Sequence, residues 1–254
     1  MLTAIALKNE SLSKRCELIN SCANITPQDS DILRAKKYSS VINSFLDDYF
    51  SLMISEDNQS VGGSILDKNN LLLSIQREIE NFKPSAISVI HNAIPSGSEG
   101  GAPKNIYQLS KAFKLSAANT VTRNLSTTMG LLWERIANLS PFVINPESEF
   151  GIKIKGIDLI SKNPETGLIE YKQLKTQRNT LTGSQAERSV IELSLHDNPV
   201  FCACFSLGSW TFGQKKIPRI SGREFWEGIG IDYDIFEREV VRLIKELEQE
   251  DTSL

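Results

Sequence analysis

One segment in the second half of the chain, from Phe150 to Leu207, constrains the fold more than any other. Its first part, EFGIKIKGIDLIS, alternates apolar and polar residues, which is typical of a half-buried strand. NPETG then supplies the Pro and Gly of a tight reversal, and GLIEYKQLK returns as a second strand. The pattern therefore predicts two adjacent strands joined by a short turn.

Helices are expected before and after this strand pair in the sequence. TVTRNLSTTMGLLWERIANL precedes it and is predicted to run to about Leu139, with Pro141 marking its end. GSQAERSVIELSLHD follows it as an amphipathic helix and leads into NPVFCACFSLGSW, a continuous apolar run typical of a strand covered on both faces. We therefore expect an α/β fold with a central sheet flanked by helices.

The first hundred residues are predicted to be helical. DSDILRAKKYSSVINSFLDDYFSLMI opens with capping residues and carries apolar residues at helical spacing. NNLLLSIQREIENFK is expected to end at Pro84, and SAISVIHNAI to form a separate, shorter helix.

A flexible stretch, SGSEGGAPKN, follows these helices and is interpreted as a loop or a soft boundary. A phosphate-binding loop is disfavoured because no Gly-Lys-Ser/Thr opens a helix after it. We therefore divide the chain into a helical N-terminal region, residues 1–100, and an α/β domain, residues 101–254. Its last segment, DYDIFEREVVRLIKELEQE, is predicted to be an amphipathic helix.

The composition is that of an ordinary globular protein, with 40% hydrophobic and 23% charged residues. No stretch approaches the roughly 18 apolar residues that span a bilayer, so no membrane association is expected. The first residues, MLTAIALKNESLSKR, have no basic leader before their short apolar run. We therefore expect a cytoplasmic protein.

Cysteine and histidine usage disfavours zinc-dependent and histidine-dependent chemistry. The four cysteines have C-x5-C and C-x-C spacings that match no zinc module. Cys202 and Cys204 alternate within an apolar run, which favours reduced thiols in a buried strand. The two histidines, His91 and His196, lie far apart in sequence.

Charge is distributed unevenly along the chain, whose net charge is −3. Between Gly101 and Arg178, eleven Lys and Arg outnumber six Asp and Glu, so this segment carries +5 and the remainder −8. A basic segment within an acidic protein is typical of a phosphate-binding cleft, although a solvated lysine-rich face has the same composition.

Three charged residues lie within the predicted strand pair. Asp158 ends the first strand, and Glu170 and Lys172 point to the same face of the second because side chains alternate along a strand. The reversal is expected to bring Asp158 near that pair. Two carboxylates in a sheet repel each other unless a cation compensates, and oxygen ligands favour Mg²⁺. The alternative is a surface hairpin with an exposed Glu–Lys ladder.

The segments GIDLI and IEYK, separated by a turn, resemble the core of the PD-(D/E)xK nuclease superfamily, and particularly its type II restriction endonucleases. The resemblance covers roughly a quarter of the chain and implies a restriction-endonuclease-like fold that cleaves double-stranded DNA at specific sites with Mg²⁺. Asp158 and Glu170 would hold the metal, and Lys172 would assist the attacking water. Glu134, on the preceding helix, would be a further metal ligand.

The sequence departs from the family pattern at two places. Ile157 replaces the proline of the motif. Gln173-Leu174-Lys175 also repeats the register three residues on, so that Lys175 could be the catalytic lysine with Gln173 in the glutamate position. We prefer Glu170 and Lys172, because the alternative would leave them without partners on the helix-covered face.

DNA contacts are expected from basic and amide side chains near the second strand and on the flanking segments, since these groups bind phosphates and base edges. The residues are Lys175, Gln177, Arg178, Asn179, Lys104, Arg123, Asn124, Lys215 and Lys216. The three tryptophans are expected to be core residues rather than stacking platforms.

The resemblance implies a homodimer if the DNA target is palindromic, with an interface on the N-terminal helices or the last helix. Two alternatives remain open at this point. One is a repair, junction-resolving or transposon-associated nuclease of the same superfamily, and the other is a non-catalytic DNA-binding or interaction module.

Overall fold

The computed structural model describes residues 2–92, 106–214 and 216–252. Within these ranges, five strands form one mixed sheet in the order β1-β2-β3-β4-β5. The first three are antiparallel neighbours, and β3, β4 and β5 run parallel. The strands are β1 (Val143–Ile144), β2 (Leu159–Lys162), β3 (Ile169–Gln177), β4 (Pro199–Phe205) and β5 (Arg219–Ser221).

The predicted reversal between β2 and β3 is confirmed. The side-chain oxygen of Asn163 accepts hydrogen bonds from the backbone N–H groups of Glu165 and Thr166. Gly167 adopts φ +70° and donates its N–H to the Asn163 carbonyl at 2.8 Å. The polar cap and the left-handed glycine together close the turn, and they set Leu159 opposite Lys172 in the ladder.

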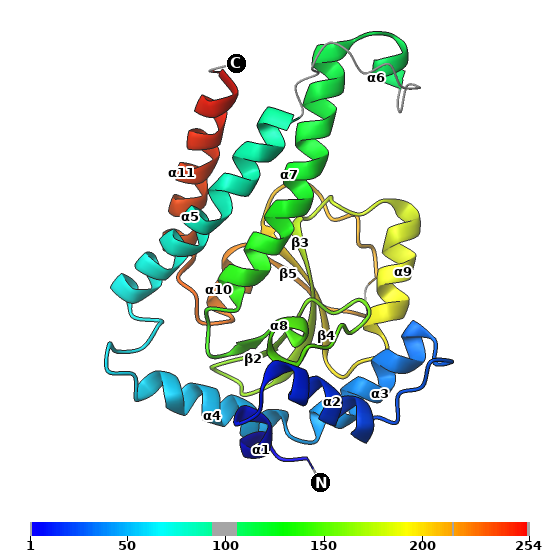
Figure 1. Ribbon diagram of the computed structural model, residues 1–254, viewed down its shortest axis with the longest axis vertical. Helices are drawn as coiled ribbons and strands as arrows, with labels where there is room; N and C mark the ends of the chain where they lie inside the picture. Colours follow the sequence, from blue (N-terminus) through cyan, green and yellow to red (C-terminus); the bar gives the residue numbers. More distant parts are fainter. Residues whose placement is uncertain (1, 93–105, 215, 253–254) are drawn as a thin grey trace.

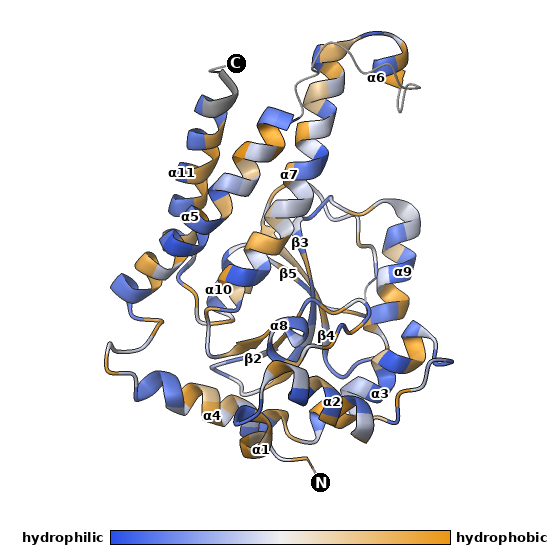
Figure 2. Ribbon diagram, in the orientation of Figure 1, coloured by the Kyte–Doolittle hydropathy of each residue, from blue (hydrophilic) through white to orange (hydrophobic). Residues whose placement is uncertain are grey.

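One face of the sheet is covered by long helices (Figure 1). Side chains of this face, including Leu159, Leu174 and Cys202, share one core with these helices. The long helices are α5 (Lys68–Asn92), α7 (Phe113–Ala137) and α11 (Tyr233–Thr252), and the short helix α10 (Arg223–Glu227) packs with them. We call this side the long-helix face. Figure 2 shows mixed polar and apolar residues along these helices, as expected of helices that bury one side.

The opposite face packs on shorter helices, mostly from the N-terminal part of the chain (Figure 1). Ile160, Tyr171 and Phe201 point to this second core. The helices are α1 (Ala4–Lys8), α2 (Leu12–Cys22), α3 (Asp31–Asn43), α4 (Leu46–Asn58), α8 (Pro146–Phe150) and α9 (Gly183–Leu193). We call this side the short-helix face. A further short helix, α6 (Ile106–Leu109), contacts α7.

The first hundred residues do not pack as a separate unit. Every described element up to Asn92 is a helix, but α1–α4 share the core of the short-helix face and α5 shares the core of the long-helix face. The predicted loop at residues 96–105 lies outside the described residues. The helical region is therefore part of the scaffold that holds the sheet.

Two predicted helix boundaries are wrong. The helix expected across residues 29–54 breaks at Ser44 and Phe45, where tightened turns let the Phe45 ring pack against Tyr49 and Phe150. Conversely, α5 continues through Pro84. Proline removes one helical hydrogen bond, but burial of Phe82 and Ala86 on either side holds the helix together.

The first predicted strand is shorter than its alternation indicates. Residues 146–150 form α8, which ends at Gly151 with φ +67°. Residues 152–157 are irregular, although Ile152, Ile154 and Ile157 are buried. Alternating burial therefore arises here in an irregular segment outside the sheet, and only Leu159–Lys162 pairs as a strand.

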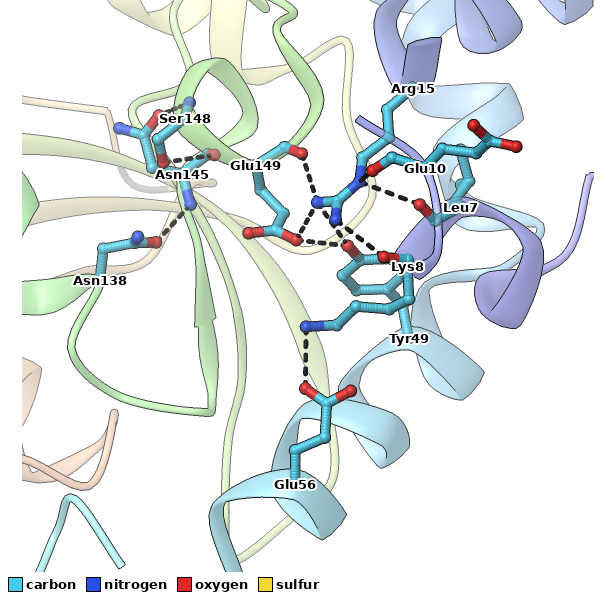
Figure 3. Close-up of polar contacts among 10 residues, drawn as sticks. All are labelled: Leu7, Lys8, Glu10, Arg15, Tyr49, Glu56, Asn138, Asn145, Ser148 and Glu149. Atoms are coloured by element: carbon cyan, nitrogen blue, oxygen red, sulfur yellow. Dashed lines mark hydrogen bonds and ion pairs between the residues drawn. The ribbon is translucent and has the colours of Figure 1, made fainter. Parts of the chain in front are cut away.

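A partly buried ionic network joins the N-terminal helices to α8 (Figure 3). The Arg15 guanidinium lies 2.6 Å from the Glu149 carboxylate and donates to the carbonyls of Leu7 and Lys8. Tyr49 donates its hydroxyl to the same carboxylate, and burial raises the pKa of this phenol. Because Arg15 is only 16% exposed, these contacts are poorly screened by solvent.

No helix in the described ranges is long and apolar enough to cross a membrane.

The Arg15 network is expected to contribute strongly to stability. Arg15→Met should lower the free energy of unfolding by roughly 2–4 kcal/mol, because it leaves the Glu149 carboxylate partly buried without its cation. Lys14→Met, one residue away in the exposed pair with Glu17, is the matched control and should cost less than about 0.5 kcal/mol. Urea unfolding measures both, and equal effects would contradict this account.

Candidate active site

Asp158 lies immediately before β2, beside the middle of β3. Its backbone N–H donates to the Lys172 carbonyl at 2.9 Å. Its Oδ2 accepts a hydrogen bond from the backbone N–H of Leu174 at 2.7 Å. Because Leu159 is opposite Lys172, Asp158 is next to Gln173 and faces the same side of the sheet. The carboxylate is thus held in place by the β3 backbone.

Lys175 is the basic side chain nearest to this carboxylate. Its Nζ lies 3.9 Å from Asp158 Oδ2. The two side chains are 25% and 27% exposed, so both remain accessible from solvent. The distance exceeds a hydrogen bond, which leaves room for a bridging group between ammonium and carboxylate.

Glu134 approaches the same point from α7. Asn145, which follows β1, donates its side-chain N–H to Glu134 Oε2 at 3.2 Å. Burial, followed by the charge of Asp158, raises the pKa of Glu134 to about 7, and Lys175 partly offsets that rise. The pKa of Asp158 is also raised by burial, against the lowering effects of Lys175 and the Leu174 N–H.

Gln173 lies on β3, two residues before Lys175 and on the same face of the sheet. Its side chain is 7% exposed, and its Oε1 is buried without a hydrogen-bond partner among the described residues. Leaving a buried amide oxygen unpaired costs roughly 1–3 kcal/mol. An oxygen in that state, on the same strand face as Lys175, is available to a cation or a water.

The expected convergence of Asp158 with Glu170 and Lys172 is not found. Glu170, Lys172 and Leu174 alternate with Gln173 and Lys175, and Leu174 belongs to the core of the long-helix face. The Lys172 ammonium forms an ion pair with Glu170, and its side chain is only 2% exposed. These two residues therefore satisfy each other on the side of the sheet away from Asp158.

Two interpretations made from the sequence change with this geometry. The alternative interpretation, a surface hairpin with an exposed Glu–Lys ladder, is wrong, because the side chains of Glu170 and Lys172 are only 19% and 2% exposed. The objection to the Gln173–Lys175 register also fails, because Glu170 and Lys172 do have a partner on the helix-covered face. The register that we disfavoured from the sequence is the one whose lysine, Lys175, lies beside Asp158.

The predicted DNA-contacting residues lie in several places. Lys175 belongs to the site, and Gln177, Arg178 and Asn179 follow it at the end of β3. Arg123 and Asn124 are exposed on α7, about three helical turns before Glu134 on the same helix. Lys216 is exposed beyond β4, whereas Lys104 and Lys215 lie outside the described residues.

Asn145 is a residue of the candidate site that sequence reasoning missed. It caps α8 through its side-chain oxygen and holds Glu134 through its side-chain nitrogen. The Asn145-Pro146 pair is a recognisable helix start, so the cap was predictable from the sequence. Its second contact was not, because that contact depends on where α7 ends relative to β1.

The oxygen atoms gathered here fit a hard divalent cation. Among the described residues, no group of three or more His, Cys, Asp and Glu side chains is placed to hold a metal, and all four cysteines are free thiols. Glu134 and Asp158 supply two carboxylates, and the unpartnered Gln173 Oε1 supplies an amide oxygen. Mg²⁺ favours such ligands and retains several waters in its remaining positions.

No protein-family model matches the sequence, and no curated protein matches it.

The raised pKa of Glu134 predicts a specific dependence of stability on pH. The folded protein keeps this proton between about pH 4.5, the ordinary value, and about pH 7, whereas the unfolded chain loses it. Stability should therefore fall as pH rises through that window. Glu134→Gln should flatten the fall, measured as the midpoint of urea unfolding at successive pH values.

Glu165→Gln, on the exposed β2–β3 turn, is the matched control and should follow the wild-type profile. A Glu134→Gln profile that also follows the wild type would show that this carboxyl is not perturbed.

Proposed function

We propose that this protein is a Mg²⁺-dependent endonuclease that cleaves double-stranded DNA at specific sites, in the manner of the type II restriction enzymes that its sequence resembles. The observation that carries the proposal is the position of Lys175, 3.9 Å from Asp158, with Glu134 close enough for the charge of Asp158 to raise its pKa and the unpartnered Gln173 oxygen on the same strand. Two carboxyls with raised pKa values lie in this cluster, and a cation would stabilise their ionised forms.

The carboxylates would hold the cation. The Leu174 N–H fixes Asp158, and Asn145 orients Glu134, so both carboxyls are already positioned before a cation binds. Glu134 would lose its proton on binding, because a positive charge stabilises the ionised form. When bound, Mg²⁺ lowers the pKa of a coordinated water and neutralises charge on the scissile phosphate.

Lys175 would act on the phosphate side of the cluster. Its Nζ lies 3.9 Å from Asp158, too far for a tight pair, which leaves its N–H groups free to orient a water. The same ammonium would stabilise the negative charge that develops on the phosphate oxygens during attack. Gln173 would take the place that a glutamate holds in the resembling motif.

The topology is consistent with a restriction-endonuclease-like core. Helix α7 supplies Glu134, β2 and β3 form the antiparallel pair that carries Asp158 and Lys175, and α9 crosses over to the parallel strand β4. From β2 to β4 this is the strand–strand–helix–strand order that the resemblance implies, with β1 and α8 between α7 and β2. A palindromic target would favour a homodimer with one site for each strand.

Two lysine variants separate the site around Lys175 from the one expected around Lys172. Lys175→Met should reduce Mg²⁺-dependent cleavage of plasmid DNA by at least about 100-fold, because the transition-state charge loses its partner. The paired change Glu170→Gln with Lys172→Met removes the buried ion pair on the opposite face without leaving one charge alone. That double variant should retain cleavage once it is confirmed to be folded by circular dichroism.

Discrete bands from plasmid DNA, lost in EDTA and in Asp158→Asn, would support the restriction assignment. A smear or structure-dependent nicks would instead indicate another nuclease with the same site. Wild-type protein that leaves DNA intact with Mg²⁺ would contradict the proposed function.

A further inference from the structure

A second cluster lies on the short-helix face beyond β4, and the proposed mechanism does not use it. Trp210 has two arginines against its ring, with the guanidinium carbons of Arg178 and Arg219 at 5.6 and 5.4 Å from the ring centroid. The indole packs edge-on against Phe201, at 6.0 Å between centroids. Phe201 belongs to the core, so the ring is anchored rather than loose on the surface.

The position of Arg178 is fixed along both its backbone and its side chain. Its backbone N–H donates to the Leu207 carbonyl, and its own carbonyl accepts from the Thr211 N–H, both at 3.1 Å. Its side-chain Nε donates to Ser221 Oγ at 2.9 Å. That hydroxyl also contacts Ser206 Oγ at 3.1 Å, so a second layer supports the arrangement.

Arg219 is held in a similar way from the start of β5. Its Nη1 donates to the Phe212 carbonyl at 2.7 Å, and its guanidinium contacts the same indole as Arg178. Neutral acceptors therefore position both guanidinium groups, and their positive charges are not neutralised by these contacts. Each keeps further N–H groups for another acceptor, since a guanidinium carries five.

Neither arginine forms an ion pair with a described carboxylate. Arg223 provides the contrast within the same chain, because it lies 5.2 Å from the Tyr233 ring but pairs with Glu227 and Asp234. The two positive charges beside one ring repel each other, and their attraction to the indole offsets only part of that repulsion. The pair therefore generates a fixed positive potential that favours an anion.

The strand register places this cluster on the same face as Asp158. Gln173, Phe201 and Arg219 align across β3, β4 and β5, and Lys175, Ala203 and Ser221 align in the next row. Neighbouring strands lie about 4.8 Å apart, so β5 is roughly 10 Å from β3. Phe201 and Ala203 are buried, so a strand of DNA whose phosphate reached Asp158 and Lys175 would pass along the carboxyl end of β3, where Arg178 follows Lys175 by three residues.

We propose that Arg178, Trp210 and Arg219 form a binding site for backbone phosphates of DNA that flank the phosphate cleaved at Asp158. The ligand identity rests on the proposed function, whereas the anion preference rests on the two unpaired guanidiniums. Trp210 acts as the rigid wall that sets the spacing of the two arginines, a role different from the core residue expected from sequence. Phosphate binding contributes to affinity equally for all sequences.

The test measures DNA binding separately from cleavage, by fluorescence anisotropy of a labelled mixed-sequence duplex in EDTA at several salt concentrations. Arg178→Met with Arg219→Met should weaken binding by roughly tenfold for each arginine near 0.1 M salt. The slope of log K against log salt should fall by about 0.9 for each phosphate that the variant no longer neutralises. Arg178→Lys with Arg219→Lys keeps the charge and should restore most of the slope.

Arg223→Met is the matched control, because its charge is already paired, and it should bind like the wild type. Wild-type affinity and slope in the double methionine variant would overturn the proposal, as would a folded wild-type protein that does not bind the duplex. If the double methionine variant fails to fold, the single variants Arg178→Met and Arg219→Met are measured in its place, and each should lower the slope by about 0.9.

The two proposals fail in different ways. Binding that depends on both arginines, together with wild-type protein that never cleaves, would support this phosphate site and contradict the nuclease. Cleavage that depends on Asp158 but is indifferent to both arginines would do the reverse.

Discussion

Side-chain alternation along β3 is the constraint on which the rest of the structure depends. The strand lies between two cores, so each residue is committed to the long-helix face or the short-helix face. Glu170 and Lys172 fall on the first face and Gln173 and Lys175 on the second. A shift of one residue would exchange the two sets, bury the wrong pair and separate Lys175 from Asp158. The ladder register therefore decides which charged residues can act together.

The two charged clusters on either side of β3 differ in how well their charges are compensated. Glu170 and Lys172 form a one-to-one ion pair, which is neutral and nearly buried. Burial raises the pKa of both Asp158 and Glu134, the charge of Asp158 raises that of Glu134 further, and Lys175 offsets part of both shifts. Carboxyls perturbed in this way are found at functional sites, where a ligand stabilises their ionised forms. We therefore take this cluster, rather than the neutral Glu170–Lys172 pair, as the candidate for chemistry.

Much of the core could be predicted from sequence, because period-two and period-3.6 patterns report burial directly. The β2–β3 turn, α9, β4 and the position of Asp158 beside β3 all follow from such local patterns. The position of Lys175 beside Asp158 did not, because it depends on which helices cover which face, and that depends on contacts far apart in sequence. β1 and β5 contain only two and three residues, too few to show a period. Helix α5 continues past Pro84 because of tertiary packing, which overrides local propensity.

The central claim is that Asp158, Glu134 and Gln173 hold one divalent cation. Titration calorimetry of Mg²⁺ into the protein near pH 6.5, repeated in buffers of different ionisation enthalpy, tests it most directly. The account predicts binding that is accompanied by proton release, because Glu134 is partly protonated at that pH, and that is abolished in Asp158→Asn. Binding that persists unchanged in Asp158→Asn, or no detectable binding to the wild-type protein, would contradict it.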